Sequence, residues 1–458
     1  MSTKEVALPV DGKIAFREKL GYSLGDAASN LYWKTFEFFL MIFYTDVFGA
    51  PAAAIGTMLL VTRFADAVAD PLMGSIADRT QSRWGHFRPY LIWFAVPFAV
   101  GGVLTFTAPH LSGGAKIVYA YITYSLLMFL YTAVNIPYTA LMGVMTSNSA
   151  ERTSISSIRF IGAFTAGIFV QYSTLWLVKT LGRGNEQLGW QLTMALYGVL
   201  AVGMFVLCFA GTRERVVPPA QQKSDVRRDV ASLITSHPWQ ILVGVMLLVL
   251  AAFAIKGSDS AYYFKYFVQN EKLLPPFLVS NGIAFVAAVS IATPLARIFG
   301  KKLLFVLAIG IGGLIIGGFW MVKPTDIAAI FALQILSSFV IGFNSPLVFA
   351  MFADVADEAE WRTGRRNTGL VFASAIFSTK VGWAIGSWIF GLLLAGFGYV
   401  ANTRQTTHAL RGIVLSTSWI PCLMLVTAAL LMTAYPLSER RMVEIEAELK
   451  ARRGEMAE

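Results

Sequence analysis

The sequence contains twelve apolar stretches, each about 20 residues long or longer, and mostly short polar connections separate them. In the core of a bilayer no water can bond the backbone N–H and C=O groups, so a spanning segment must be a helix or a strand of a closed barrel. A barrel strand needs only about 9–11 residues. The sequence therefore predicts an all-α membrane protein with twelve transmembrane helices. The predicted spans are 22–46, 52–76, 88–109, 116–145, 153–178, 189–211, 239–268, 275–298, 302–322, 325–354, 368–398 and 411–435.

The charge distribution also indicates a membrane protein. Charged residues make up 14% of the chain, against about 25% in a soluble protein. The formal net charge of +10 could suggest nucleic acid, but the basic residues lie in short loops between spans, mostly on the side that both chain ends share. This bias is typical of cytoplasmic loops. We expect the lipid bilayer and no nucleic acid as partner, both termini in the cytoplasm, and a multi-pass protein of the bacterial inner (plasma) membrane.

An internal repeat divides the spans into two sets of six. The segments 135–151 and 344–360 both read N-x-P-x4-M-x7-A-E. The first lies at the end of the fourth span and the second at the end of the tenth, which is the fourth span of the second set. Two such six-helix bundles are the architecture of the major facilitator superfamily, whose members carry a substrate between the halves. The longest polar connection contains tandem prolines and is predicted to be a linker. The predicted domains are an N-terminal bundle, 1–210, a cytoplasmic linker, 211–238, a C-terminal bundle, 239–436, and a cytoplasmic tail, 437–458, expected to form a solvated helix.

The connection after the second span is similar to a loop motif of this superfamily. It reads GSIADRTQSRWGHFRPY, residues 74–90, with an Asp-Arg pair and further arginines. Such an acid can neutralise a helix end, and the arginines anchor the cytoplasmic face. The segments that follow the two repeat motifs are also acidic and basic, and we expect ion pairs there that break and re-form. The predicted gating residues are Asp78, Arg79, Arg152, Asp354 and Asp357.

Three ionisable residues lie inside the second span. Arg63, Asp66 and Asp70 are spaced i, i+3 and i+7, which places them on one helix face. Each charged acid at mid-membrane costs about 2.5–3.5 kcal/mol on insertion scales. Two structural explanations remain open, because Arg63 could pair with Asp66, or the acids could cap a break before Pro71. The functional explanation is that two carboxylates one turn apart share a small cation or a proton.

Seven motifs along nearly the whole chain resemble the glycoside–pentoside–hexuronide:cation symporters of the major facilitator superfamily. The resemblance implies a secondary active transporter, not an enzyme, that moves a sugar or glycoside with a coupling cation, H+ or Na+, by alternating access and without a cofactor. The motifs are KLGYSLGDAASN (19–30), FYTDVFG (43–49), RFADAVADPLMG (63–74), RTQSRWGHFRPY (79–90), NIPY (135–138), AERTSISSIRF (150–160) and FSTKVGWAIG (377–386).

The resemblance also implies a cation-coupling site. The acids of the family's second helix correspond to Asp66 and Asp70, and a hydroxyl of its fourth helix to Thr132. In the family pattern an Asn precedes the second acid, whereas this chain has Ala69. One neutral oxygen ligand is therefore missing. Sodium needs several oxygen ligands and a proton needs one carboxylate, so we expect proton coupling, with sodium at Asp66 and Asp70 as the alternative.

A sugar site is implied in the same way. The family's acids on helices 1 and 4 correspond to Asn30 and Asn135, its helix 5 arginine to Arg159, and one aromatic position to Tyr131. An amide can donate to and accept from sugar hydroxyls, but it lacks the strength of a charged group. Asp26 lies nearer the cytoplasmic end and could be solvated.

Further charges lie within later spans. Lys380 is expected to need a carboxylate partner, with Asp66 or Asp70 as candidates, and Trp383 one turn on could line the substrate cavity or only pack. The segment KGSDSAYYFKYF, 256–267, predicts a discontinuous helix whose polar side faces the cavity, or else an outward-facing polar end.

Two other functions remain open. A lipid or drug carrier on the same fold would have an apolar interior, which the polar set Asn30, Asn135, Arg159 and Lys380 disfavours. A transport-derived membrane sensor would normally carry an output domain larger than these tails. An enzyme is not expected, because the four histidines lie in loops or at span ends. We expect a monomer, and the sequence leaves the sugar open.

Overall fold

The computed structural model describes residues 13–146, 148–215, 233–363 and 368–455, so most of the predicted linker lies outside the described residues. This part of the chain is helical, and ten of its helical segments are long and apolar enough to cross a membrane. The two other predicted spans correspond to α1 (Phe16–Ile42), which carries several charges, and to the pair α3 (Arg88–Trp93) and α4 (Ala95–Thr105). The predicted all-α membrane class is confirmed.

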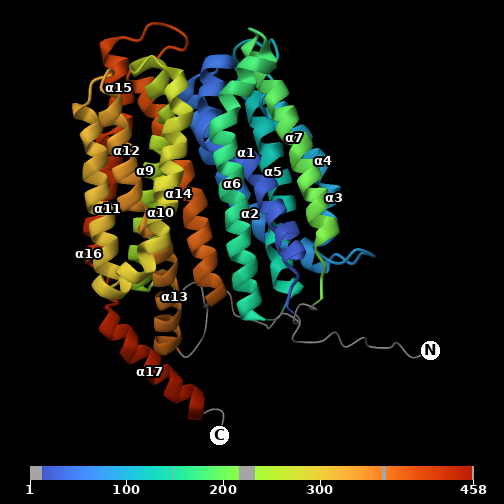
Figure 1. Ribbon diagram of the computed structural model, residues 1–458, viewed down its shortest axis with the longest axis vertical. Coiled ribbons are helices and arrows are strands. Elements are labelled where there is room, and N and C mark those ends of the chain that lie inside the picture. Colours follow the sequence, from blue (N-terminus) through green and yellow to red (C-terminus); the bar gives the residue numbers. More distant parts are fainter. Residues whose placement is uncertain (1–12, 147, 216–232, 364–367, 456–458) are drawn as a thin grey trace. The chain divides into compact units, whose positions relative to one another are not determined.

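Packing divides the chain into two compact units, Met1–Ala50 with Phe64–Gln221, and Pro51–Arg63 with Gln222–Glu458. The helix α2 (Ala52–Arg79) thus contributes its first part to the second unit and its remainder to the first. Within each unit the long helices run side by side (Figure 1). The other elements of the first unit are η1 (Phe43–Val47), α5 (Gly114–Met145), α6 (Ser149–Gly182) and α7 (Glu186–Gly211).

In the first unit, α1 packs against α6 and α7 and is fastened to α5 by two tyrosines. The rings of Tyr22 and Tyr138 stack with centroids 4.5 Å apart. Each hydroxyl donates to the other residue's backbone carbonyl, at 3.2 Å and 2.8 Å. A Cβ at Gly25 would lie 2.4 Å from the Tyr138 ring, so a glycine is required where this ring lies on α1.

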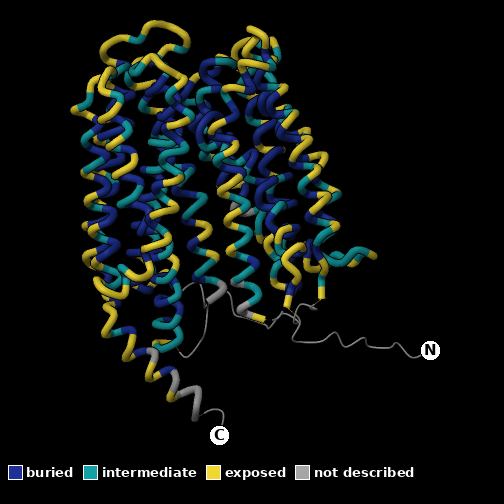
Figure 2. The backbone as a smooth tube through the Cα atoms, viewed as in Figure 1, coloured by how far each residue is buried: buried dark blue, intermediate teal, exposed yellow. Residues whose placement is uncertain are grey.

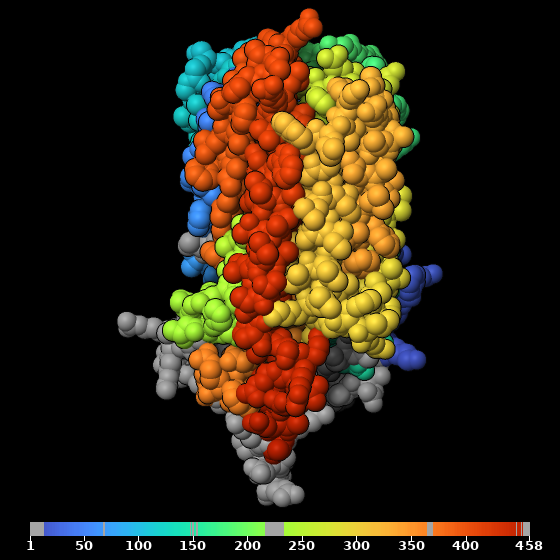
Figure 3. Space-filling view, turned by 90° about the vertical axis from the view of Figure 1, so that its left-hand side faces the viewer, coloured from blue at the N-terminus to red at the C-terminus, as the bar shows by residue number. Residues whose placement is uncertain are grey.

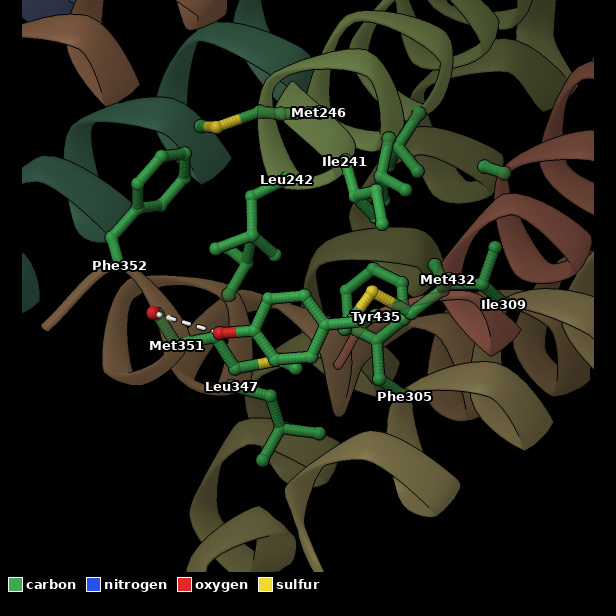
Figure 4. Packing of buried hydrophobic residues seen from close by; sticks show 14 of the residues in the cluster. Ile241, Leu242, Met246, Phe305, Ile309, Leu347, Met351, Phe352, Met432 and Tyr435 are labelled. Carbon is green, nitrogen blue, oxygen red and sulfur yellow. Dashed lines mark hydrogen bonds between the residues drawn. The ribbon is translucent and has the colours of Figure 1, made fainter. Parts of the chain in front are cut away.

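The second unit is built around α9 (His237–Tyr262), which packs against α14 (Thr368–Gly396). A Cβ at Gly386 would lie 2.3 Å from the carbonyl oxygen of Ala251, so the two backbones meet closely there. In the core, Tyr435 lies among apolar side chains, and its hydroxyl donates to the Met351 carbonyl at 3.4 Å (Figure 4). The remaining elements are η2 (Tyr263–Phe267), η3 (Glu271–Leu273), α10 (Leu274–Phe299), α11 (Lys301–Gly317), η4 (Gly318–Met321), α12 (Ile327–Gly342), α13 (Asn344–Thr363), α15 (Thr407–Thr417), α16 (Trp419–Thr433) and α17 (Glu439–Glu455).

The two units share a rare local structure. In each, the first long helix passes into a five-residue π-helix, η1 after α1 and η2 after α9. The N–H groups of Phe48 and Val268 each donate to the carbonyl five residues earlier, both at 2.9 Å. Because π-helical turns are rare, their recurrence at matching places supports the internal repeat. The repeat's prolines differ, since Pro137 lies inside the continuous α5 whereas Pro346 lies in the first turn of α13.

The sequence predicted that the C-terminal tail forms a solvated helix. The helix forms, as α17, but only part of its surface is exposed to solvent. One face, with Met442, Ile445 and Leu449, is buried in the core of the second unit, and buried and exposed positions alternate along the helix (Figure 2). Trp361 at the end of α13 donates its indole N–H to Glu448 at 2.6 Å. In the space-filling view α17 lies below α16, beside the orange end of α13 (Figure 3). Charged residues on one face hid the apolar stripe on the other.

Candidate functional site

The predicted coupling residues of the first unit come together around one hydroxyl. Thr132 on α5 lies with its Oγ1 2.5 Å from Asp66 Oδ1 and 3.2 Å from Asp70 Oδ1, both on α2. Asp66 is 3% and Thr132 1% exposed, whereas Asp70 is half-buried. Arg63, one turn earlier on α2, is also buried. The helical spacing of the acids and the position of the hydroxyl thus place two carboxylate oxygens within hydrogen-bonding distance of one threonine hydroxyl.

The Thr132 hydroxyl has one proton to share between the oxygens of Asp66 and Asp70. A threonine hydroxyl carries one proton, and ionised carboxylates can only accept. If Thr132 donates to Asp66, a proton on one of the carboxyl groups would supply the donor for its contact with Asp70. A sodium ion would need further oxygen ligands, and Ala69 offers no side-chain oxygen.

A second polar cluster joins α1 to α6, and the sequence prediction missed its central residue. Asp26, which by its position in the sequence could be solvated, is only 8% exposed. Its carboxylate accepts from Arg159 Nε at 2.7 Å and from Asn30 Nδ2 at 3.3 Å. Asn30 also donates to the Asp26 backbone carbonyl at 2.9 Å. The predicted Asn30 and Arg159 are therefore brought together by an acid one helical turn before Asn30, and this i, i+4 spacing was the available signal.

Aromatic rings lie beside Arg159 and, farther along α1, between α1 and α5. The Arg159 guanidinium lies 5.7 Å from the ring centroid of Tyr138, a distance at which a cation and an aromatic face attract. Trp33 on α1 stacks on the predicted Tyr131 of α5, with centroids 5.6 Å apart and an interplanar angle of 25°. Asn135, one turn after Tyr131, is half-buried. An ion pair, two amides and flat apolar rings are the groups that sugar hydroxyls and sugar faces contact.

In the second unit the predicted residues Lys380 and Trp383 lie on α14, and both are half-buried. The polar segment 256–267, for which the sequence predicted a discontinuous helix, is helical throughout. The helix α9 is continuous to Tyr262 and then passes into η2. Lys256 donates to Gln334 Oε1 at 2.6 Å, and the Thr417 hydroxyl donates to Asp259. Gly257, Ser258 and Ser260 suggested a break, but they lie inside the α-helix α9, and the helical geometry changes only after them, at η2.

Two of the five predicted gating residues, Arg152 and Asp354, make contacts within their own unit. Arg152 donates from Nε to the Thr146 carbonyl at 2.9 Å and from Nη2 to the Gly143 carbonyl at 3.1 Å, so it caps the end of α5. Asp354 pairs with Lys301 of α11. Asp78 and Arg79 are exposed at the end of α2, Asp357 is half-buried, and no ion pair of these three occurs within the described chain.

Glu151 beside Arg152 joins α6 to the start of α1. It accepts from Lys19 Nζ at 2.8 Å and from the Ile14 N–H at 3.0 Å. The hydrogen bond from Lys19, and then that from the Ile14 N–H, lower the pKa of this carboxyl, so it stays ionised at neutral pH. These two contacts hold the start of α6 to the start of α1 within the first unit.

Three residues after α7, Arg213–Glu214–Arg215, lie in the predicted linker 211–238 but make ordered contacts, and we call this segment the strap. Glu214 accepts from the N–H groups of His86, Phe87 and Arg88, at 2.8 Å, 2.8 Å and 2.9 Å. These N–H groups begin α3 and have no carbonyl partner within the helix, so the carboxylate caps it. Arg215 pairs with Glu18 of α1 at 2.6 Å. The strap therefore fastens α1 and α3 to the end of α7.

Replacing Glu214 with alanine is expected to lower the thermal unfolding temperature of the purified protein. Three N–H groups would lose their charged acceptor, and the net loss is about 1–3 kcal/mol because water replaces part of the bonding. Glu214→Gln keeps one oxygen acceptor and is expected to lose less. Thermal unfolding followed by intrinsic fluorescence measures both. An alanine variant that unfolds at the wild-type temperature would show that this cap contributes nothing.

Comparisons with known proteins identify the family. Residues 21–439 match the family model described as MFS/sugar transport protein. The isoprimeverose transporter of Lactiplantibacillus pentosus is 37% identical over 415 residues, covering 89% of this chain and 86% of that protein. The inner membrane symporter YicJ of Escherichia coli is 34% identical over 427 residues, 92% of each chain.

A solved structure agrees on the fold. The crystal structure of a D-xylose-proton symporter superposes with a TM-score of 0.64 and 16% identity, over 92% of this chain and 97% of that one. At this identity the likeness shows the fold alone, which is that of the major facilitator superfamily. The chain thus belongs to the MFS/sugar transport protein family, the glycoside–pentoside–hexuronide:cation symporters, and is a multi-pass membrane transporter and not an enzyme.

Proposed function

We propose that the protein takes up a neutral glycoside together with a proton, by alternating access, and that Asp66, Asp70 and Thr132 form the coupling site. Membership of a cation-coupled sugar symporter family is established, and the cation and the sugar are the subject of this proposal. The Thr132 hydroxyl between two carboxylates carries the proposal. Binding a proton removes one negative charge from a buried pair, which lowers the cost of rearranging α2 against α5.

The Asp26–Arg159 pair supports a neutral substrate. The arginine that could bind a sugar carboxylate is already neutralised by Asp26 at 2.7 Å. In this arrangement Asp26 accepts from sugar hydroxyls and Arg159 donates to them, while the stacked Trp33 and Tyr131 lie where an apolar sugar face can rest. An isoprimeverose transporter at 37% identity agrees with a glycoside substrate.

Uptake of labelled glycosides into membrane vesicles tests the proposal. The panel contains glucosides, xylosides, galactosides and a hexuronide, each with an imposed pH gradient, an imposed sodium gradient, or neither. We expect one neutral glycoside to accumulate with the pH gradient alone. Accumulation that needs sodium would overturn the proton assignment, and accumulation of the hexuronide alone would overturn the neutral substrate.

A further inference from the structure

A carboxylate that plays no part in the proposed coupling site is buried in the second unit. Asp259 lies in the last turn of α9 and is 0% exposed. The Thr417 hydroxyl of α15 donates to its Oδ2. Its Oδ1 is buried and has no hydrogen-bond partner among the described residues. One oxygen is therefore bonded to a neutral group and the other to nothing.

No cation neutralises this carboxylate within the described chain. Lys256, one turn earlier on α9, instead donates to Gln334 and lies 4.8 Å from the ring centroid of Phe319. Lys265 of η2 donates to Asn402. The other ionisable groups on the elements packed against α9 make no ion pair or hydrogen bond with Asp259. They are Lys380 on α14, His408 and Arg411 on α15, Asp354, Asp357, Glu358, Glu360 and Arg362 on α13, and Tyr262, Tyr263 and Tyr266 beside it.

The energetic balance favours the neutral acid. An ionised carboxylate in such a place costs several kcal/mol after relaxation, because only an uncharged hydroxyl compensates it. A carboxylic acid costs much less because it carries no charge: Thr417 can keep donating to Oδ2 while the proton resides on Oδ1. The single bonded oxygen and the single unpartnered oxygen are the arrangement expected of a protonated side chain.

The backbone around Asp259 is irregular in two places. Thr417 is the last residue of α15, and Ser418 leaves helical geometry with φ −115° and ψ −92° before α16 begins. The π-helix η2 starts four residues after Asp259, at Tyr263, whose hydroxyl is also buried without a partner in the described chain. Broken helices and π-helical turns recur at ion and substrate sites of transporters.

We propose that Asp259 is a second proton-binding site, which exchanges its proton with water in another conformation of the transport cycle and holds it in this one. Loading forms one O–H bond on the carboxylate with a proton from the aqueous phase, and release returns that proton to water. Asp259 lies 22 residues after His237, about 33 Å along the helix, so the exchange occurs near the membrane face opposite to the start of α9. The inference rests on the proposed proton coupling.

Proteoliposomes containing wild type, Asp259→Asn or Glu271→Gln test the stoichiometry. Glu271 is an exposed acid beyond η2, so its amide variant is the matched control. Proton uptake per sugar is measured with an internal pH dye and labelled sugar. We expect one proton fewer per sugar in Asp259→Asn and the wild-type ratio in Glu271→Gln. An unchanged ratio in Asp259→Asn overturns the second site, whereas a wild type without sugar-dependent proton uptake overturns the proposed proton coupling itself.

Infrared spectra provide a second readout that does not depend on transport or on the folding of Asp259→Asn. We expect the wild-type protein to show the carbonyl band of a protonated carboxylic acid, and Thr417→Val to shift this band because the hydroxyl partner is lost. Glu271→Gln is expected to leave it in place. If Thr417→Val alters no protonated-acid band, the bands present belong to other carboxyls such as the Asp66–Asp70 pair, Asp259 contributes none, and the proposal is overturned.

Discussion

Replacing Asp66 with asparagine is expected to remove the proton coupling of this site, and with it most of the gradient-driven accumulation of sugar, while leaving sugar exchange across the membrane. Asp66 is the more buried acid and makes the shorter contact with Thr132, so its charge is the one that proton binding must cancel. Asparagine has nearly the same shape but cannot take up or release a proton. The accumulation ratio is therefore expected to fall to the part that the Asp259 proton can drive, and the internal sugar concentration to fall to the external one when Asp259→Asn is added. Labelled-sugar uptake and counterflow in vesicles measure the two activities.

Two further variants test this explanation. Asp70→Asn is expected to have a smaller effect, because Asp70 is half-buried and lies 3.2 Å from Thr132. Glu186→Gln, an exposed acid at the start of α7, is the matched control and is expected to accumulate sugar normally. If Asp66→Asn and Asp70→Asn both concentrate sugar as the wild type does, the coupling assignment is wrong.

Replacing Arg159 with glutamine is expected to abolish sugar binding and to destabilise the protein. The change leaves Asp26 as an unpaired charge in the first unit, and breaking a buried pair costs about 3–5 kcal/mol. Arg159 is 22% exposed at its side chain, so we expect the lower end of that range. Sugar binding by isothermal calorimetry and thermal unfolding by fluorescence give the two quantities.

The double variant Asp26→Asn with Arg159→Gln separates structure from function. It removes both charges, so stability is expected to return toward that of the wild type. Sugar binding is not expected to return, because the charged donor and acceptor for the hydroxyls are both missing. A double variant that binds sugar with wild-type affinity would show that the pair only holds α1 to α6.

The sequence predicted the helical membrane class well, because the need to bond the backbone in lipid acts on every residue of a span. The contact of Thr132 with Asp66 and Asp70 also agrees with the set named from the helical spacing and the family motifs. Asp26 was missed for a physical reason. Position along α1 suggests how near the membrane surface a residue lies, but not that Arg159, more than a hundred residues later, reaches it.

Other differences come from tertiary context. Arg152 was expected in an ion pair, but the carbonyl groups at the end of α5 are free acceptors close by in the chain, and they bind it instead. The strap around Glu214 lies in a segment whose composition is that of a linker, and only the fold brings the three N–H groups of α3 to it. Local composition does not reveal such partners.

The docking of α17 makes the end of the chain an integral part of the second unit. A chain truncated after Leu437 would lack α17. It would expose the apolar surface that Met442, Ile445 and Leu449 now cover, and Trp361 would lose its hydrogen bond to Glu448. Such truncated variants are therefore expected to aggregate during purification, even though every transmembrane helix is retained. Fusion partners for detection or capture should be joined beyond this helix and not in place of it.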